Sequence, residues 1–291
     1  MRFAVCAIVW LLVLGCDPEF PDRSLVEGYR VLGVVAVPPD VGPEDTFTLS
    51  LIETDTPDIQ YTWTACLAPL GSEFGFRCLD EVFEISLPYD SASPTIDLGP
   101  NGINYFAKLI DGFTQLAAKS PEFADAAMGE NPDGESMDVS FAELQFNITS
   151  GPPNGRQVTT IKVMKVYFDD SARNRNPEIL SFDVTTPTPV KGCDIVRFEY
   201  GVNETLFDDY TLVNGTELVE ENIMTWYATA GTFTDDPSKD DKERNISTSQ
   251  QSEMFLKLPE TIGAETVQVW GILRDERGGT DFRTLTLPVV Q

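Results

Sequence analysis

The chain has 291 residues, with 47 Asp and Glu against 20 Lys and Arg, a net charge of −27 and no histidine. The acidic surplus argues against nucleic-acid binding and against attachment to anionic lipid through basic residues, because both need a positive surface. The absence of histidine excludes Ser-His-Asp and Cys-His catalysis and histidine-containing zinc sites. The length and a hydrophobic content of 42% predict two domains with packed cores.

The first residues are a short basic start and an apolar run over residues 3–15. This run is shorter than the about 20 residues that a membrane-spanning helix needs, and it is typical of the core of a signal peptide. It ends in Val13-Leu14-Gly15-Cys16, which resembles the lipobox of bacterial lipoproteins. The resemblance implies a lipoprotein signal peptide over residues 1–15 and a lipid anchor on Cys16, which would hold the protein to a membrane. The alternative is an ordinary signal peptide followed by a chance cysteine.

Residues 16–28 contain Pro, Gly and charges without periodicity, which predicts a flexible tether. The rest consists of short alternating runs bounded by Gly, Pro, Asn and Asp, which is typical of an all-β chain. One pattern occurs twice: a strand, a proline corner, a polar turn, a second strand and then a strand that contains tryptophan. It starts at Val31 and again at Ile179, and it predicts tandem domains over residues 29–170 and 171–291.

Cysteines at positions 66 and 78 flank a segment rich in Gly and Pro. In an exported protein we predict a disulfide between Cys66 and Cys78, worth about 3 kcal/mol through the unfolded state. Cys193 is left over. We interpret it as a small buried apolar residue; the alternative, a thiol nucleophile, lacks a histidine partner.

Residues 102–128 predict a helical insertion in the first domain. Apolar residues recur at helical spacing, Asn101 is a candidate cap and Pro121 follows; the apolar positions are Ile103, Phe106, Ile110, Phe113 and Ala117. We expect a helix that covers an open end or edge of the domain. The alternative is a lid or a partner-binding helix.

In the second half, a Trp226 strand is followed by a Trp270 strand, a Gly278-Gly279 turn and a last strand. This order resembles bacterial immunoglobulin-like and PKD-like sandwich domains, and the whole chain resembles Gram-negative lipoproteins with two such domains. The resemblance implies an all-β fold of two tandem immunoglobulin-like β-sandwich domains, the first with the helical insertion. It implies that both tryptophans pack the core rather than stack on a ligand.

Two acidic clusters are candidates for calcium, which prefers carboxylate and carbonyl oxygens. In the first, Asp235, Asp236, Asp240 and Asp241 would be the ligands, although Lys239 and Lys242 interrupt the cluster. The second lies between the domains at residues 169–177 and resembles the oxygen-rich linkers of cadherin-like repeats. The alternatives are a solvated acidic loop and a polar linker whose arginines neutralise its acids. No other cofactor is predicted.

No spacing singles out catalytic residues, so we predict a non-enzymatic protein of the cell envelope, held by its lipid to the outer membrane. Its domains would form a binding or spacer module whose partner is another protein or a glycan. The alternatives are a surface adhesin for glycans or cells and a structural subunit of an envelope complex that docks through the helical insertion. A metal- or carboxylate-dependent hydrolase is the least favoured class.

Overall fold

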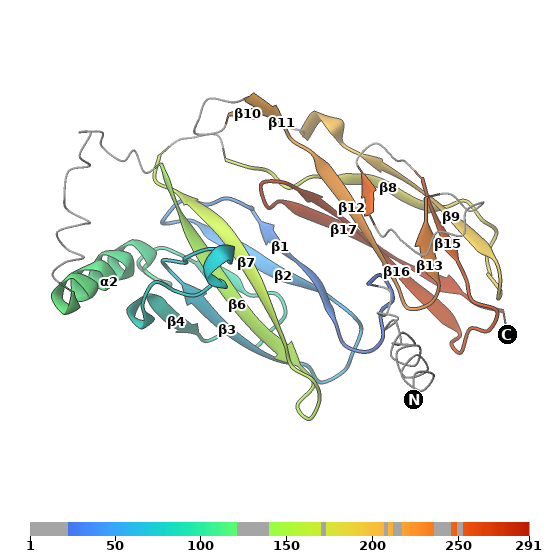
Figure 1. Ribbon diagram of the computed structural model, residues 1–291, viewed down its shortest axis with the longest axis horizontal. Helices are drawn as coiled ribbons and strands as arrows, with labels where there is room; N and C mark the ends of the chain where they lie inside the picture. Colours follow the sequence, from blue (N-terminus) through green and yellow to red (C-terminus); the bar gives the residue numbers. More distant parts are fainter. Residues whose placement is uncertain are drawn as a thin grey trace, which may run out of the picture.

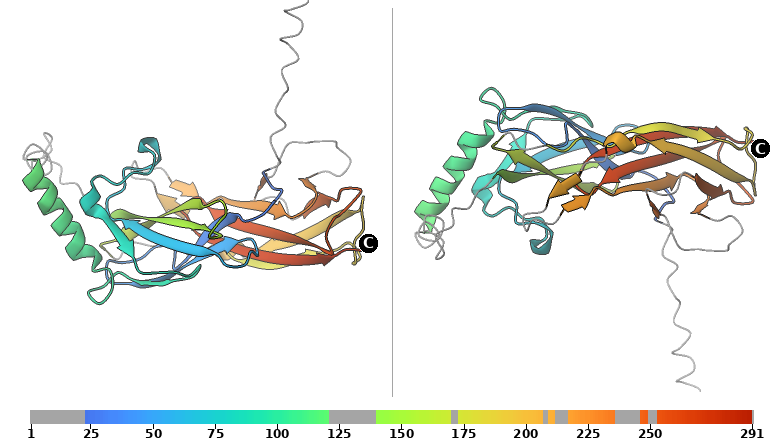
Figure 2. Two further views of the ribbon diagram at one scale, coloured as in Figure 1. Left: turned by 90° about the horizontal axis from the view of Figure 1, so that it is seen from below. Right: turned by 90° about the horizontal axis from the view of Figure 1, so that it is seen from above.

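The computed structural model describes residues 23–120, 140–169, 173–206, 209–211, 217–235, 246–248 and 253–290. Two sandwiches follow one another along the long axis of the molecule, with helix α2 at one end and the last described residues at the other (Figures 1 and 2). None of the helices in these ranges combines the length and the apolar character needed to cross a membrane.

Domain 1 contains strands β1 to β7 in two antiparallel sheets, ordered β1-β2-β5 and β4-β3-β6-β7. Trp63 and Phe146 are fully buried between them. The strands are β1 (Val31–Val37), β2 (Thr46–Glu53), β3 (Gln60–Cys66), β4 (Glu84–Leu87), β5 (Thr95–Asp97), β6 (Phe141–Gly151) and β7 (Val158–Tyr167).

Domain 2 contains strands β8 to β17, with sheets ordered β13-β15-β9-β8 and β14-β12-β16-β17 and a separate pair β10-β11. Its core is built around Trp226, whose ring contacts the aromatic rings of Phe182, Phe198, Tyr200 and Phe233. The strands are β8 (Ile179–Val184), β9 (Ile195–Val202), β10 (Asp209–Thr211), β11 (Glu217–Val219), β12 (Asn222–Ala228), β13 (Thr232–Thr234), β14 (Ile246–Thr248), β15 (Glu253–Lys257), β16 (Thr266–Asp275) and β17 (Thr280–Pro288).

The strand orders are those of immunoglobulin-like sandwiches. In domain 2, β8, β9, β15 and β13 occupy the positions of strands A, B, E and D, and β12, β16 and β17 those of C, F and G. Domain 1 has the same arrangement with β1 to β3 and β5 to β7, and its edge strand β4 corresponds to β14 of domain 2; among its described residues, no strand occupies position D. The predicted fold class, tandem immunoglobulin-like sandwiches, is confirmed.

The internal repeat extends to details of the first strands. In both domains the chain leaves the first sheet at its proline corner and forms a parallel bridge to the last strand, at Val41 with Val166 and at Val190 with Val289. The first strand also has a β-bulge in each domain, because Leu32 of β1 and Leu180 of β8 are skipped in the pairing register. A bulge leaves the backbone groups of the extra residue without ladder partners.

Helix α2 (Tyr105–Lys119) packs against the short 3₁₀ helix η2 (Glu81–Phe83); the other such helices are η1 (Ser72–Phe74) and η3 (Glu204–Leu206). The helix begins at Tyr105 rather than at residue 102, after Asn104 in a left-handed conformation, so Asn101 is not its cap. The rest of the predicted segment, residues 121–128, lies outside the described residues.

The predicted apolar face of α2 is packed only in part: Ile103 is buried and the Phe113 ring lies 4.9 Å from the Phe83 ring, but two other predicted positions are exposed. Tyr105 and Gly112 are buried, whereas Phe106 and Ile110 are 53% and 51% exposed. Gly112 is the reason, because a Cβ there would lie 2.5 Å from the Phe83 ring. Leu109 and Leu116 pack against the domain 1 core on the same side as Gly112. The packed face is therefore rotated from the predicted one and is centred on the close approach of Gly112 to Phe83.

Cys66 and Cys78 are joined by a disulfide, with their Cα atoms 5.6 Å apart. The intervening segment turns back on itself as a hairpin-like loop, since the Leu70 N–H donates to the Arg77 carbonyl at 2.9 Å. This is the closure that the Gly- and Pro-rich composition predicts.

Candidate binding site between the two sandwiches

The two domains are joined by an apolar interface between a sheet of each. β1 and β2 run along the side of domain 1 that faces β16 and β17 (Figure 1). Their outward side chains form one buried cluster with the outward side chains of β16; its members are Val26, Leu32, Val35, Ile52, Trp270 and Ile272. Both β1 and β16 are therefore buried on two faces, one in their own domain and one in the interface.

The chain before β1 contributes to the same interface. The Val26 N–H donates to the Ala228 carbonyl at 2.8 Å, and the Ala228 N–H donates to the Ser24 carbonyl at 3.0 Å. Ser24 and Val26 are buried. The prediction of a flexible tether over residues 16–28 is therefore wrong for Ser24, Leu25 and Val26, because these residues pair with the end of β12 in domain 2.

Arg274 of β16 connects the domains through the β1 bulge. Its Nη2 donates to the Leu32 carbonyl at 2.7 Å, and its Nη1 donates to Thr225 Oγ1 at 3.2 Å. The bulge exposes a carbonyl that β2 does not use, and the guanidinium satisfies it. Gly33 leaves room for this contact, since a Cβ there would lie 3.0 Å from Arg274 Nη2.

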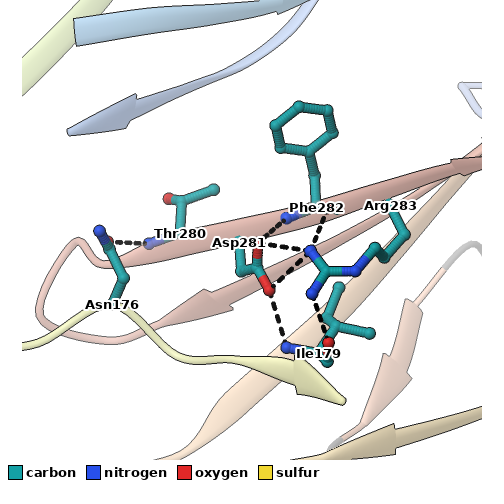
Figure 3. A network of polar contacts seen from close by, with 6 residues as sticks. All are labelled: Asn176, Ile179, Thr280, Asp281, Phe282 and Arg283. Atoms are coloured by element: carbon teal, nitrogen blue, oxygen red, sulfur yellow. Dashed lines mark hydrogen bonds and ion pairs between the residues drawn. The ribbon is translucent and has the colours of Figure 1, made fainter. Parts of the chain in front are cut away.

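The linker between the domains is held by asparagines. The Asn174 N–H donates to Asp40 Oδ2 at 2.8 Å and its Nδ2 to Asp275 Oδ2 at 3.1 Å. Asn176 donates to the Ala36 carbonyl at 2.7 Å and accepts from the Thr280 N–H at 2.8 Å (Figure 3). Each asparagine thus contacts one residue of domain 1 and one of domain 2.

An arginine of the linker is also engaged, with an acid outside the linker rather than with the linker's own acids. Arg173 forms an ion pair with Asp45 of domain 1 at 2.6 Å. Residues 170–172 of the second calcium candidate lie outside the described residues. Within the ranges that the structure describes, no three His, Cys, Asp or Glu side chains gather closely enough to hold a metal ion.

A partly buried lysine forms a further contact across the interface. Lys162 of β7 donates from Nζ to the Gly278 carbonyl, at the β16–β17 turn, at 2.5 Å. Burial lowers the pKa of Lys162 to about 8, and the charge of Asp275 opposes this shift. Burial also raises the pKa of Asp40 above its ordinary value, against the hydrogen bond from Asn174.

Beside this interface lies a cleft of about 340 Å³, which both domains line. Domain 1 provides the end of β2 and the residues after it, and domain 2 provides side chains of β16 and β17. The lining residues are Leu51, Ile52, Glu53, Thr54, Asp55, Gln268, Trp270, Phe282 and Thr284. The cleft is lined by aromatic and polar residues of both domains, and ligand sites often lie at domain interfaces.

The carboxylate of Glu53, at the end of β2, is held within domain 1 by two tyrosine hydroxyls. Its Oε2 accepts from the Tyr29 hydroxyl at 3.0 Å and its Oε1 from the Tyr61 hydroxyl at 2.7 Å. Burial, followed by the charge of Glu53, raises the pKa of Tyr29 to about 12, so this phenol stays protonated and donates across the neutral range. Burial and the Glu53 carboxylate raise the pKa of Tyr61 as well.

On the opposite wall, Phe282 is held by the polar residues on either side of it. Asp281 accepts from the Ile179 N–H at 2.7 Å and from Arg283 Nη1 at 3.0 Å, and Arg283 Nη2 donates to the Ile179 carbonyl at 2.5 Å. Figure 3 shows these two side chains on one side of β17 and the Phe282 ring on the other. The network fixes the strand that presents the ring to the cleft.

The sequence-predicted site residues lie elsewhere. Cys16, Asp236, Asp240 and Asp241 are outside the described residues, and Asp235 is exposed after β13. The prediction that Cys193 is buried is wrong: it is an exposed free cysteine. It lies in a turn before β9 with a φ of 66°, where its side chain points to no core.

Of the two tryptophans assigned to the core, only Trp226 lies within a domain core. Trp270 is 3% exposed, but it is buried in the interface and lines the cleft. A signal for this role exists in the sequence: residues 269–273, Val-Trp-Gly-Ile-Leu, are apolar without alternation. Such a run indicates a strand buried on both faces.

No protein-family model matches the sequence, and no curated protein is significantly similar to it. Among solved structures, the chain is similar to the Ig1-2 module of the Drosophila receptor protein tyrosine phosphatase DLAR, with 9% identity, 91% of this chain and 100% of that chain covered, and a TM-score of 0.25. It is also similar to the Ig1 and Ig2 domains of DIP-gamma, with 8% identity and a TM-score of 0.25. This match covers 90% of this chain and 98% of that chain. A third similar structure is that of Bacteroides ovatus SGBP-B in complex with a mixed-linkage heptasaccharide, with 9% identity and a TM-score of 0.22. This match covers 91% of this chain and 48% of that chain.

Proposed function

We propose that the chain is a membrane-anchored envelope lipoprotein, held by lipid on Cys16, whose two sandwiches act as a non-catalytic binding or spacer module for a protein or glycan. The observation that carries the proposal is the interface between the domains. Its apolar cluster and hydrogen bonds hold the sandwiches as one extended unit, so that surfaces contributed by both domains keep a fixed geometry. A stiff unit suits a spacer and a preorganised binding surface alike.

The non-catalytic part of the proposal is supported by the sequence, which contains no histidine and no nucleophile motif. The anchoring part is supported by the apolar leader that ends at Cys16. The outer membrane is the proposed location, on either its periplasmic or its outer face.

The first experiment combines lipid labelling with protease shaving of intact bacterial cells that express the chain. We expect the chain to incorporate labelled fatty acid and to lose the label in Cys16→Ala, whereas Cys6→Ala should keep it. Incorporation that is equal in both variants would refute the lipid anchor. Peptides of the two domains released from intact cells would favour an adhesin, and protection until the outer membrane is permeabilised would favour a periplasmic module.

A second candidate function is a structural subunit of an envelope complex that docks through α2. The exposed Phe106 and Ile110 side chains favour it, because exposed apolar helix faces mark protein interfaces. A photocrosslinking residue at position 110 should then capture one protein in cells, and the same residue at the exposed Leu180 should not. Equal capture at both positions would refute docking through α2.

A further inference from the structure

The domain 2 wall of the cleft is an uncharged stretch of a strongly acidic protein. The antiparallel register of β16 and β17 places three pairs of residues side by side: Gln268 with Thr286, Trp270 with Thr284 and Ile272 with Phe282. Their side chains share one face of the sheet, because residues two apart in a strand point the same way. None of the six is charged, although the chain has 47 Asp and Glu and a net charge of −27.

The domain 1 wall adds a single carboxylate at the rim of the cleft. The Glu53 carboxylate is turned into domain 1, where two tyrosine hydroxyls donate to it. The Thr54 hydroxyl is also used within domain 1, since it accepts from the Arg30 N–H at 3.0 Å and donates to the Gly28 carbonyl at 3.2 Å. Asp55 is exposed, and the lining contains neither lysine nor arginine. A ligand in the cleft therefore meets mainly uncharged groups.

Two polar side chains of the domain 2 wall are available to a ligand. Gln268 is partly exposed and Thr284 is exposed, and neither side chain is hydrogen-bonded to another described residue. An amide group and a hydroxyl group each donate and accept hydrogen bonds. Both residues lie in the paired part of β16 and β17, so the sheet fixes the backbone from which they project.

The same neutral face continues beyond the cleft. The next residues along it are Thr266, Thr286 and Pro288, and all three are exposed. A ligand longer than the cleft would therefore stay in contact with hydroxyl groups along β16 and β17. This arrangement suits a chain of several polar units better than a single small molecule.

An aromatic ring stands beside the two free polar groups. Phe282 is partly exposed, and Asp281 and Arg283 hold its strand through Ile179 from the other side (Figure 3). Trp270 is almost fully buried and forms the floor of the cleft. A pyranose ring has an apolar face of C–H groups and a rim of hydroxyls, so it can pack on an aromatic ring while its rim forms hydrogen bonds.

We infer that the cleft between the domains binds a neutral oligosaccharide. One sugar ring packs on Phe282, its hydroxyls exchange hydrogen bonds with Gln268 and Thr284, and neighbouring rings follow the exposed threonines of β16 and β17. Sugar hydroxyls both donate and accept, as the amide and hydroxyl groups of this wall do, whereas a cation supplies donors only. Acidic glycans are disfavoured by the net charge of −27 and by the absence of a base in the lining. The inference rests on the proposed binding function and names its ligand class.

The test is a titration of the full chain, labelled with nitrogen-15, in which the indole N–H signal of Trp270 is followed by NMR. Trp63 and Trp226 lie in the domain cores and provide internal reference signals. The neutral probes are cellohexaose, laminarihexaose, maltohexaose, mannohexaose and N-acetylchitohexaose. The contrasting probes are the acidic hexagalacturonate and the peptide acetyl-Gly-Ser-Arg-Ser-Gly-amide. We expect saturable shifts of the Trp270 signal with at least one neutral hexasaccharide and none with the contrasting probes.

Three variants assign the binding to the cleft. Thr284→Val removes one exposed hydroxyl with little change in shape and should weaken binding about three- to tenfold. Phe282→Leu keeps an apolar side chain but removes the ring, and should weaken binding by a similar factor. Thr62→Val, the same change as the first at an exposed residue of β3 outside the cleft, should leave the affinity unchanged.

The absence of a Trp270 shift with every neutral hexasaccharide would overturn the inference, as would a response to the peptide or to hexagalacturonate alone. Equal affinity of Thr284→Val and Thr62→Val would also overturn it. A negative titration would leave the lipid-labelling and shaving results unaffected, so failure of this inference is distinguishable from failure of the proposed function.

Discussion

Replacing Leu32 by alanine tests whether the two sandwiches stabilise each other. Leu32 is 5% exposed and belongs to the cluster between the domains. The chain offers a matched control, because Leu180 occupies the same bulge position of domain 2 and is 63% exposed.

The magnitude follows from burial. The substitution removes an isopropyl group, worth about 0.8 kcal/mol per buried carbon or about 2.4 kcal/mol in all, and the remaining cavity raises the cost to about 3 kcal/mol. Leu180→Ala removes the same group from a side chain that is mostly in water, so its effect should stay within about 0.5 kcal/mol.

The assay is equilibrium unfolding of the full chain in urea, together with hydrogen exchange of the β16 amides. We expect Leu32→Ala to lower the free energy of unfolding and to speed exchange in β16, although the substitution lies in domain 1. Leu180→Ala should do neither. If the two variants are equally stable, or if only domain 1 amides exchange faster in Leu32→Ala, the domains do not stabilise each other and the reasoning is refuted.

Three further outcomes are expected. Replacing both Cys66 and Cys78 by serine should lower stability by about 3 kcal/mol, because the disulfide closes a loop with a sequence separation of 12; an unchanged urea midpoint would contradict this. Since the pKa of Lys162 is lowered from 10.5 to about 8, the unfolded chain binds more protons between these pH values and stability should rise with pH there. Urea midpoints from pH 7.5 to 9.5 should show a smaller rise in Lys162→Met than in the unmodified chain, and equal slopes would exclude this lysine as the cause. Gly271→Ala should cost about 1–3 kcal/mol in thermal unfolding, because the new Cβ would lie 2.5 Å from the Phe182 ring; full stability would show that the ring moves freely.

The fold class could be predicted from the sequence because sandwich strands have strong local signals. Each signal depends only on residues close together in the sequence. The signals are the repeated proline corner, the tryptophan strands and the Gly278-Gly279 turn. Gly278 has a φ of 99°, as the predicted tight hairpin requires. Such local patterns can be recognised in one sequence, without knowledge of which strands pair in space.

The cleft could not be predicted in this way, because its walls come from different domains. Glu53 and Phe282 are far apart in the sequence, and only the packing of β1 and β2 on β16 brings them together. The unbroken apolar runs of β1 and β16 do indicate burial on two faces, but they do not say which strand covers which. The hydrophobic pattern of α2 also predicted only part of its packed face, because Gly112, which has no side chain, makes the closest contact with Phe83.

The interface joins two different surfaces, one on each repeat, and among the described strands the other repeat lacks the residues that would form the same surface. On the domain 2 side, the interface is formed by Trp270 and Ile272 of β16. The residue between them, Gly271, pairs with the core residue Trp226. In domain 1 the residue that pairs with Trp63 is Ile148, and its neighbours are the polar Asn147 and Thr149.

On the domain 1 side, the interface residues of β1 and β2 also have no apolar equivalents in the described strands β8 and β9. Domain 1 offers Val35 and Ile52, whereas the equivalent register positions of domain 2 hold Asp183 and Gly201. A head-to-tail contact between repeats would otherwise propagate from copy to copy into an open filament. A third repeat packed on domain 2 in the same way would bury the carboxylate of Asp183, so among the described residues the contact between these two repeats does not offer a surface for its own repetition.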